Sequence, residues 1–255
     1  MNFITGNNFK HIANYILDEF GFRHNKHTED NPTYFVKTDY IHEFFNSPLL
    51  PNITFSLITH NSDHDINHSH AEYLGYNFLN RWFAQNVNYE HQKLIPIPIG
   101  VANPEWPHGN ISILKAVIKE NNIKKNIAYA NFNIRTNHQQ REYCLNNIPE
   151  KIVEIENNVD FYTYLKHTSQ AYFSICPLGN GIDSHRIWES LYLHTVPIVE
   201  MTHNIKWLTK KYNLPIIIIQ DWAELSQMTL NASLYETMIK NFNVNCLSID
   251  NFINI

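Results

Sequence analysis

An arginine and a glutamate three residues apart, Arg186 and Glu189, have the types and spacing that suit a phosphorylated, hydroxyl-rich ligand. A guanidinium group donates two parallel hydrogen bonds to phosphate oxygens, and a carboxylate accepts hydrogen bonds from paired sugar hydroxyls. Residues three apart on a helix lie on the same side of it. The pair therefore offers an anion site beside a hydroxyl acceptor, which is what binding a nucleotide sugar requires.

The elements that must position this pair are a strand, a loop, a helix and a second strand within residues 171–199. Residues 171–175 are apolar and favour a strand. Four residues then interrupt regular structure: Pro177, Gly179, Asn180 and Gly181. Asp183 or Ser184 can begin a helix that continues to about residue 193. The helix start directs backbone N–H groups and a positive dipole end toward an anion such as a phosphate.

The same stretch resembles the C-terminal signature of exostosin-like glycosyltransferases, a pattern of the form CPxGxGxDxxRxWExLxxGxxPVV. Residues 176–199 read CPLGNGIDSHRIWESLYLHTVPIV. They depart from the pattern at Leu178, where an Arg is often found, and at His194 or Thr195, where a Gly is usual. Residues 93–110, KLIPIPIGVANPEWPHGN, resemble the segment that joins the two domains of these enzymes.

The resemblance implies a hexosyl- or pentosyltransferase that moves a sugar, with inversion, from a UDP- or GDP-linked donor to a hydroxyl of a glycan or glycoconjugate acceptor. It implies that Arg186 binds the diphosphate and Glu189 the ribose. The loop expected to approach the donor comprises Gly179, Asn180, Gly181 and Asp183. No metal or other cofactor is expected, because enzymes of the GT-B type generally use basic side chains and helix dipoles instead.

Alternating strands and helices predict an α/β fold of two Rossmann-like domains facing a cleft, and the resemblance adds the GT-B type. Residues 1–104 are expected to form an acceptor-side N-terminal domain. Residues 105–123 are expected to be a linker and a helix, and residues 124–255 the domain that binds the nucleotide sugar. Prolines at residues 93–99 predict a short or edge strand. The apolar run at 215–219 predicts a strand buried on both faces.

A second polar cluster follows the predicted strand at residues 53–59. It contains His60, Asp63, His64, Asp65, His68 and His70. Ligands bind beyond the carboxyl ends of parallel strands, so Asp63 or His60 is expected to remove the proton of the acceptor hydroxyl, with Asp63 slightly preferred. Three alternatives stay open: a solvated loop, a metal-dependent hydrolase that uses these side chains as ligands, and a nucleotide-binding protein without catalysis.

Residues 131–136 follow the first strand predicted in the C-terminal half. Arg135 is expected to neutralise the diphosphate together with Arg186, unless it is a surface residue at a helix start. Arg141 is a weaker substitute. Three tryptophans can stack on sugars, although tryptophan most often belongs to a core. These are Trp82, Trp106 and Trp188.

Composition narrows the classes of partner. The formal charge is −5, 17% of residues are charged and no basic block occurs, so a nucleic-acid partner has no support. Three widely spaced cysteines without a CxxC pattern fit a reducing compartment. The sequence shows no membrane-spanning or secretory segment. These features predict a cytoplasmic location, in a bacterium or a virus-infected host cell.

Overall fold

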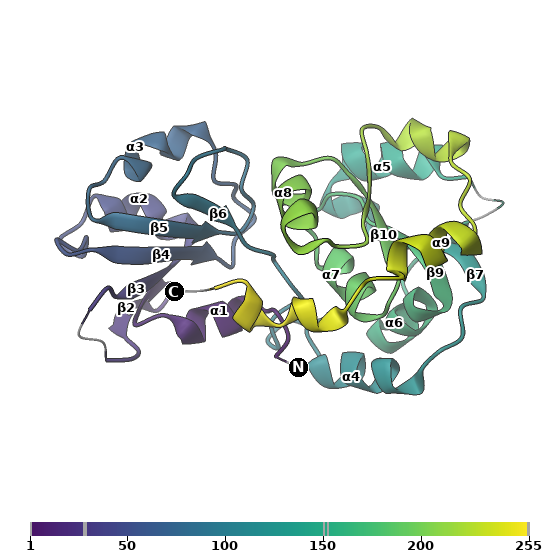
Figure 1. Cartoon of the computed structure of the whole chain (residues 1–255), viewed down its shortest axis with the longest axis horizontal. Coiled ribbons are helices and arrows are strands. Elements are labelled where there is room, and N and C mark those ends of the chain that lie inside the picture. The colour runs from purple at the N-terminus through teal and green to yellow at the C-terminus, as the bar shows by residue number, and fades with distance from the viewer. Residues whose placement is uncertain (1, 28–29, 150, 152, 254–255) are drawn as a thin grey trace. The chain divides into compact units, whose positions relative to one another are not determined.

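The computed structural model describes residues 2–27, 30–149, 151 and 153–253. The chain divides into two compact units. The first unit comprises Met1–Ile99 with Ser248–Ile255, and the second comprises Gly100–Leu247. Each unit is built on its own sheet of mainly parallel strands with helices, as Rossmann-like domains are (Figure 1). Residues 105–123, expected to be a linker and a helix, belong to the second unit, and the last eight residues are grouped with the first.

The sheet of the first unit has six strands in the order β2-β1-β3-β4-β5-β6. They are β1 (Tyr15–Asp18), β2 (Gly21–His24), β3 (Thr33–Lys37), β4 (Phe55–His60), β5 (Leu79–Ala84) and β6 (Leu94–Pro96). Strand β2 pairs antiparallel with β1, and all other pairs are parallel. The short edge strand β6 confirms what the prolines predicted. The parallel strands follow one another in chain order, so this sheet has no point at which the strand order reverses.

Both faces of the first sheet are covered. The helices are α1 (Gly6–Ile12), α2 (Ile41–Phe45) and α3 (Ala71–Leu74), and the short 3-10 segments are Thr38–Tyr40, His68–His70 and Ile249–Asn251. Figure 1 shows α2 and α3 on one side of the sheet and α1 on the other. Alternate residues of β4 point to the two sides, so Phe55 and Leu57 join the core under α2 and α3. His60 instead faces Phe9 of α1, with ring centroids 5.1 Å apart.

The sheet of the second unit has five strands in the order β11-β10-β9-β7-β8, all parallel. They are β7 (Asn126–Asn131), β8 (Val153–Glu156), β9 (Ala171–Ile175), β10 (Val196–Glu200) and β11 (Ile217–Ile219). The chain runs outward from β7 to β8 and then returns to β9 on the other side of β7. The strand order therefore reverses between β7 and β9. The prediction that the 215–219 strand is buried on both faces is wrong, because β11 is an edge strand with Ile217 and Ile218 only partly buried.

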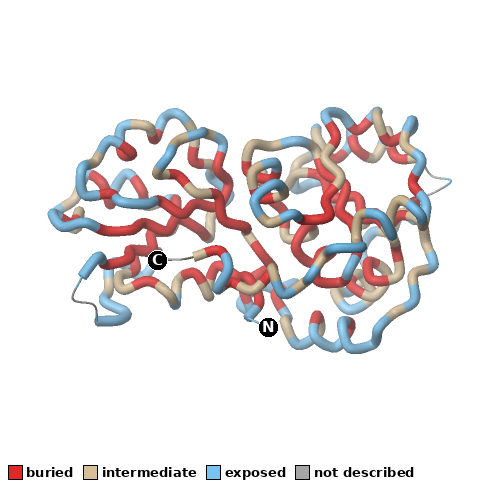
Figure 2. The backbone as a smooth tube through the Cα atoms, viewed as in Figure 1, coloured by how far each residue is buried: buried red, intermediate tan, exposed pale blue. Residues whose placement is uncertain are grey.

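Helices cover both faces of this second sheet. They are α4 (Ile111–Glu120), α5 (His138–Asn147), α6 (Phe161–Gln170), α7 (His185–Tyr192), α8 (His203–Tyr212) and α9 (Ala232–Ile239), with 3-10 segments Ile134–Thr136, Trp222–Gln227 and Val244–Leu247. The core under α5 and α9 takes alternate strand residues such as Ala128 and Phe173. The opposite face, which carries Tyr129 and Ser174, meets α6 and α7. Figure 2 shows the central strands of both units buried. Helix α7 confirms the helix predicted between residues 183 and 193.

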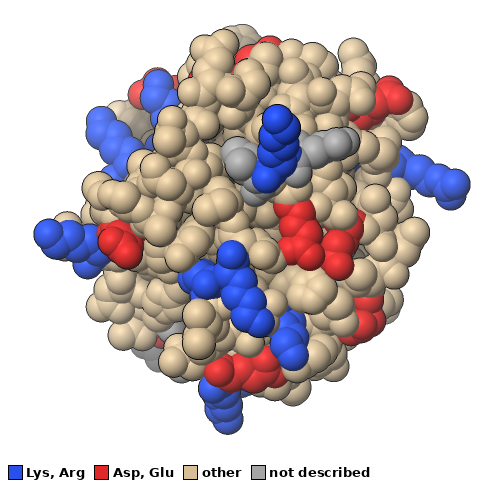
Figure 3. Space-filling view, turned by 90° about the vertical axis from the view of Figure 1, so that its right-hand side faces the viewer, with Lys and Arg blue, Asp and Glu red and all other residues tan. Residues whose placement is uncertain are grey.

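The charge distribution on the surface and the lengths of the helices relate to what nucleic-acid binding and membrane crossing require. On the face drawn in Figure 3, acidic and basic side chains are interspersed, and the basic ones form no continuous surface. Continuous basic surfaces are typical of nucleic-acid binding. Of the helices in the described part of the chain, none has the length and apolar character needed to cross a membrane.

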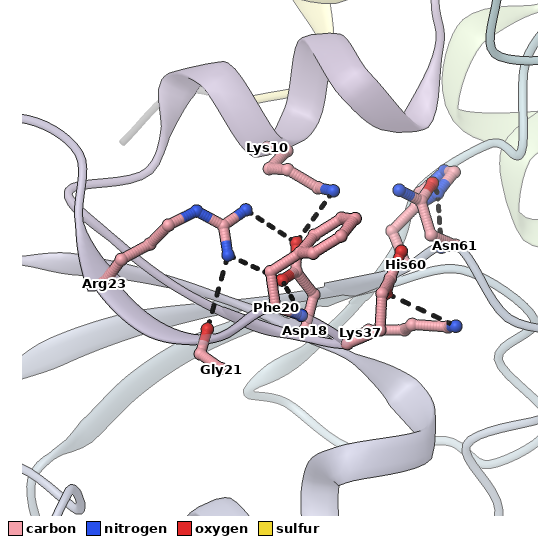
Figure 4. A network of polar contacts seen from close by, with 9 residues as sticks. Lys10, Asp18, Phe20, Gly21, Arg23, Lys37, His60 and Asn61 are labelled. Atoms are coloured by element: carbon pink, nitrogen blue, oxygen red, sulfur yellow. Dashed lines mark hydrogen bonds and ion pairs between the residues drawn. The ribbon is translucent and has the colours of Figure 1, made fainter. Parts of the chain in front are cut away.

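A buried carboxylate anchors the edge of the first sheet at the end of β1. Asp18 is 2% exposed. It forms ion pairs with Arg23 at 2.6 Å and with Lys10 of α1 at 2.9 Å (Figure 4). The backbone N–H of Phe20 donates to the same carboxylate at 3.0 Å. Burial alone would raise the pKa of Asp18, but the hydrogen bonds from Arg23 and Lys10 outweigh it and hold the pKa well below its usual range. This network joins α1, β1 and β2.

We predict that Asp18→Asn lowers the free energy of unfolding by about 3 kcal/mol at pH 7, because it removes one partner of a buried ion pair. The native pKa of Asp18 lies below the unfolded value of about 3.9, so its stabilisation is complete above that pH and is lost as the pH falls. Urea unfolding of both proteins from pH 7 to pH 3 tests this. The difference between them should be constant down to about pH 5 and then shrink. A pH-independent difference would contradict the assignment.

Candidate functional site

The candidate site lies at the carboxyl ends of β7 and β9, where the strand order of the second sheet reverses. In open α/β sheets, ligands bind in the crevice outside the carboxyl ends of the strands at such a reversal. The loop after β7 leads into α5, and the loop after β9 leads into α7. Helices α5 and α7 cover opposite faces of the sheet, so the two loops bring side chains from both faces to one place.

Arg186 lies in the first turn of α7, as predicted, and its side chain reaches across to β7. Its Nε donates to the backbone oxygen of Asn131, the last residue of β7, at 2.6 Å. This single contact fixes the guanidinium over the carboxyl end of the strand. The described residues provide no further hydrogen-bond partner for its two terminal nitrogens.

Arg141 of α5 is the residue that ties the two loops together. Its side chain is buried, with 3% of the residue exposed. Its Nε donates to the backbone oxygen of Leu178 at 2.8 Å, and its Nη1 donates to that of Asn133 at 2.7 Å. Asn137 adds a second link, because its Nδ2 donates to the backbone oxygen of Gly179 at 2.8 Å. The loops after β7 and β9 are thus held as one body.

The two arginines place positive charge at this edge, and the nearby carboxylate of Glu189 interacts with Arg186 only through its charge, without a direct contact. Within the part of the chain that the structure describes, neither guanidinium forms an ion pair with a carboxylate. Burial, and next the charge of Arg186, lowers the pKa of Arg141 to about 10. A Cβ at Gly179 would lie 3.5 Å from Arg141 Nη2, so a larger side chain there would cover this nitrogen. A buried cation such as Arg141, held only by carbonyl oxygens, favours an anionic ligand.

Asp183 fixes the end of the loop between β9 and α7 through hydrogen bonds that its side chain accepts. This residue is 3% exposed. Its Oδ1 accepts hydrogen bonds from the backbone N–H of Ser184 at 2.8 Å and from the indole N–H of the fully buried Trp188 at 2.9 Å. The arrangement gives Asp183 a structural part in fixing the start of α7. Ser184 occupies the N-cap position, but its side chain makes no capping hydrogen bond.

Glu189 lies one turn further along α7, and the structure encloses it more deeply than the pattern suggested. It is 3% exposed, and its Oε2 accepts a hydrogen bond from the Tyr164 hydroxyl of α6 at 2.8 Å. Burial raises the pKa of Glu189 to about 6, although Tyr164 and Arg186 act in the opposite direction. A ribose that binds this carboxylate has to share it with the Tyr164 hydroxyl. The ribose contact stays a prediction.

We predict that Glu189→Gln removes a pH-dependent part of the stability. A carboxyl group whose pKa is raised on folding stabilises the fold below its unfolded pKa, and this contribution is lost as the pH rises through about 6. The free energy of unfolding of the wild type relative to the variant should therefore fall by about 1 kcal/mol between pH 5 and pH 8. Glu236→Gln, at an exposed position of α9, is the matched control and should show no such slope. Equal slopes in both variants would contradict the burial of this charge.

The remaining residues expected at the donor are spread over the two loops. Asn180 is exposed and Gly181 is buried. Arg135 is exposed on the surface, in the 3-10 segment before α5, and only its backbone N–H makes a hydrogen bond, to Asn133 Oδ1 at 3.0 Å. Sequence reasoning ranked Arg141 below Arg135. A signal for Arg141 was present, because Arg141 lies one turn before Cys144 on the buried side of a helix that is otherwise polar.

In the first unit, His60 is part of the packing at the end of β4. It is 1% exposed, and its Nε2 faces the backbone oxygen of Pro98 at 3.1 Å, which assigns the proton to this nitrogen. Its Nδ1 accepts the backbone N–H of Asn61 at 2.7 Å. Burial lowers the pKa of His60 to about 4. Helix α1 packs so closely here that a Cβ on Gly6 would lie 2.7 Å from His60 Nδ1. Both ring nitrogens are in use, which leaves Asp63 as the better candidate base.

The other side chains of the 60–70 segment mostly hold their own loop. Asp65 accepts hydrogen bonds from the side-chain amides of Asn67 at 3.0 Å and Asn88 at 3.3 Å. His70 Nδ1 accepts the backbone N–H of Asn67 at 3.3 Å. Asp63 is exposed, and its backbone oxygen accepts from Asn86 at 3.4 Å. Among the described residues, this segment contains no three side chains grouped closely enough to hold a metal ion.

One group of potential metal ligands does occur, at the outer strand of the second sheet. It consists of Glu154, Glu156 and His167, whose ligand atoms lie within 4.8 Å of one another. The Glu156 carboxylate is already engaged, because it contacts His167 Nδ1 at 2.6 Å and accepts the Tyr129 hydroxyl at 2.8 Å. Asn126 donates to Glu154. The group therefore has a hydrogen-bonding role without a metal, and we assign none to it.

A comparison with known families finds one match. Residues 114–241, half of the chain, match the RXYLT1 C-terminal domain. RXYLT1 is a xylosyltransferase related to the exostosin-like glycosyltransferases. The matched range contains β7 to β11 and both arginines of the candidate site. No curated protein matches the chain.

Proposed function

This chain belongs to the RXYLT1 C-terminal domain family, and from this premise we propose that it transfers a sugar from a nucleoside diphosphate sugar to a hydroxyl of a glycan acceptor. The family match supports a glycosyltransferase. The particular sugar, base and acceptor are parts of the proposal. Because the family takes its name from a xylosyltransferase, a xylosyl donor linked to UDP or GDP is the first to test.

The observation that carries the proposal is the pair Arg141 and Arg186 at the reversal point of the second sheet. They come from helices on opposite faces, and three of their terminal nitrogens make no hydrogen bond to a described residue. A diphosphate offers oxygens to several donors at once and would form with these arginines the direct ion pairs that no described carboxylate forms. The start of α7 adds its dipole at the same place.

In the proposed reaction, an oxygen of the acceptor forms a bond to the anomeric carbon as the bond from that carbon to the diphosphate breaks. Negative charge grows on the leaving diphosphate, and Arg186 and Arg141 stabilise it. The acceptor hydroxyl gives its proton to a base, for which we propose Asp63. An attack from the side opposite the leaving group inverts the anomeric centre. We further propose the GT-B type and a reaction that uses basic side chains without a metal.

We predict that Arg186→Ala weakens binding of UDP or GDP, whichever the wild type binds, by about 10- to 100-fold, since a charge-assisted contact contributes about 1.5–3 kcal/mol. Arg186→Lys should recover only part of the loss, because an ammonium lacks the planar fork of donors. Isothermal titration calorimetry measures both.

Lys119→Ala, at an exposed position of α4, is the control for the loss of one positive charge and should leave the affinity unchanged. An unchanged dissociation constant in a folded Arg186→Ala variant would remove this arginine from the site. A wild-type protein that binds neither nucleotide would end the proposed function.

The alternatives are a metal-dependent hydrolase at residues 60–70 and a nucleotide-binding protein without catalysis. We predict that Asp63→Asn lowers turnover in sugar transfer by about 10²- to 10⁴-fold while the dissociation constant of the donor nucleotide stays the same. Transfer by the wild type should be unaffected by a chelator. Asp65→Asn is the control for the loss of a carboxylate in the same loop. Asp65 is held by the side-chain amides of Asn67 and Asn88, so its replacement should not lower turnover as Asp63→Asn does.

A hydrolase at this loop would instead lose bound metal in Asp63→Asn and would lose activity with the chelator. A binding protein would hydrolyse no donor even at long incubation. Near-normal transfer in Asp63→Asn would move the base to another residue of the first unit.

A further inference from the structure

A turn in the second unit presents a tryptophan to solvent. Trp106 is 57% exposed. The other two tryptophans considered for sugar stacking, Trp82 and Trp188, are fully buried core residues, and so is Trp222. An indole is a large flat group that is costly to leave in water, and proteins use exposed aromatic rings to contact ligands. Trp106 is therefore the tryptophan to examine for a binding role.

Trp106 lines an open pocket of about 620 Å³ at the start of α4. Its polar lining residues are Glu105, Asn110 and Ser112, and prolines form much of the rest. No lysine or arginine lines it. A flat apolar ring beside a carboxylate, an amide and a hydroxyl suits a ligand with one apolar face and several hydroxyl groups. The absence of a lining cation distinguishes this pocket from the arginine site, where a diphosphate is expected.

The turn that carries Trp106 is closed by backbone hydrogen bonds, which fix the backbone from which the indole projects. The backbone N–H of Trp106 donates to the backbone oxygen of Asn103 at 3.0 Å, and the backbone N–H of Gly109 donates to the backbone oxygen of Trp106 at 2.8 Å. A Cβ on Gly109 would lie 1.8 Å from the Asn103 oxygen, so the chain crosses itself too closely for any larger residue. Prolines at 104 and 107 restrict the backbone further. A site ordered before binding loses less entropy when the ligand arrives.

A row of rings connects this pocket to the start of α7. The Trp106 and His108 rings lie 6.4 Å apart with 25° between their planes, and the His108 and His185 rings lie 5.9 Å apart. His185 Nδ1 contacts the Gly100 oxygen at 2.7 Å and directly precedes Arg186. Desolvation and the charge of Arg186 lower the pKa of His108, which indicates how near the turn lies to that arginine. The pocket thus adjoins the arginine site within one unit.

We propose that the pocket beside Trp106 is a subsite for a sugar ring of the glycan acceptor, with the apolar face of the ring stacked on the indole and its hydroxyls bonded by Glu105 and its neighbours. This inference rests on the proposed function for the identity of the ligand as an acceptor. A neutral ring fits the pocket, and its position beside the arginine site brings an acceptor close to the bound donor.

The test is a titration of the whole chain with methyl glycosides of xylose, glucose, galactose and N-acetylglucosamine and with their β-linked disaccharides. The readout is quenching of tryptophan fluorescence by acrylamide, because the fully buried Trp82, Trp188 and Trp222 are shielded from the quencher. The partly buried Trp207 of α8 is replaced by Phe in every protein compared, so that Trp106 gives the quenchable signal. At least one sugar should protect against quenching, with a dissociation constant on the order of 1–10 mM. Trp106→Ala should remove this protection and, in saturation-transfer NMR, weaken the same sugar at least about tenfold.

Glu105→Gln should weaken the sugar about threefold to tenfold through loss of a charged acceptor. Tyr162→Ala removes an exposed aromatic ring on α6 outside the pocket and should leave sugar binding unchanged. Circular dichroism confirms the fold of each variant. If none of the sugars binds, or if a folded Trp106→Ala variant binds the sugar as the wild type does, the inference is overturned.

Two further measurements separate this inference from the proposed function. The sugar should bind equally with and without saturating UDP or GDP, and Trp106→Ala should keep the wild-type nucleotide affinity. Displacement of the sugar by a UDP-sugar but not by UDP would make the pocket a donor-sugar site and overturn the acceptor assignment. A wild type that binds the sugar at Trp106 but binds no nucleotide would refute the proposed function and the acceptor assignment with it, leaving a sugar site alone.

Discussion

The candidate site depends on two like charges that backbone carbonyl oxygens hold together. Arg141 and Arg186 come from helices on opposite faces of the second sheet and meet where its strand order reverses. Carbonyl oxygens fix their positions but supply only partial negative charge, and no described carboxylate forms an ion pair with either guanidinium. The hydrogen bonds of Arg141 to Leu178 and Asn133 also join the loops after β9 and β7. The same contacts therefore set the shape of the site and keep both positive charges at it.

In the first unit, by contrast, the buried charge is paired with charges of opposite sign. At the end of β1, Asp18 receives Arg23 and Lys10, and the charges compensate one another within the fold. The parallel strands of that sheet follow chain order, so no crevice arises from a reversal. Its loop after β4 is fixed by side chains such as His60 and Asp65, and the Asp63 proposed as the base is exposed in the same loop. Electrostatics and topology therefore both support the proposal of an anion site in the second unit.

Local patterns in the sequence predicted the helix at α7, the edge strand β6 and the place of Arg186, because propensity and proline chemistry act over a few residues. The sequence did not predict that Tyr164 would contact Glu189, since the two lie 25 residues apart and meet only when α6 and α7 pack on one face. It misjudged β11, because an isoleucine run reads the same at the centre of a sheet and at its edge. It did not indicate that Arg141 would be buried and would join the two loops, since a polar helix conceals one buried charged position.

The linked loops have a thermodynamic consequence. A ligand that binds the native state and not the unfolded chain stabilises the fold in proportion to the logarithm of its concentration. An anion that neutralises Arg141 and Arg186 would relieve a repulsion between α5 and α7, and these helices cover the two faces of one core. Binding at the site would then stabilise the whole second unit against unfolding, and not the two loops alone. If the proposed anion binds there, folding and substrate supply are coupled, and the resistance of this unit to heat and proteolysis would rise with the concentration of that anion.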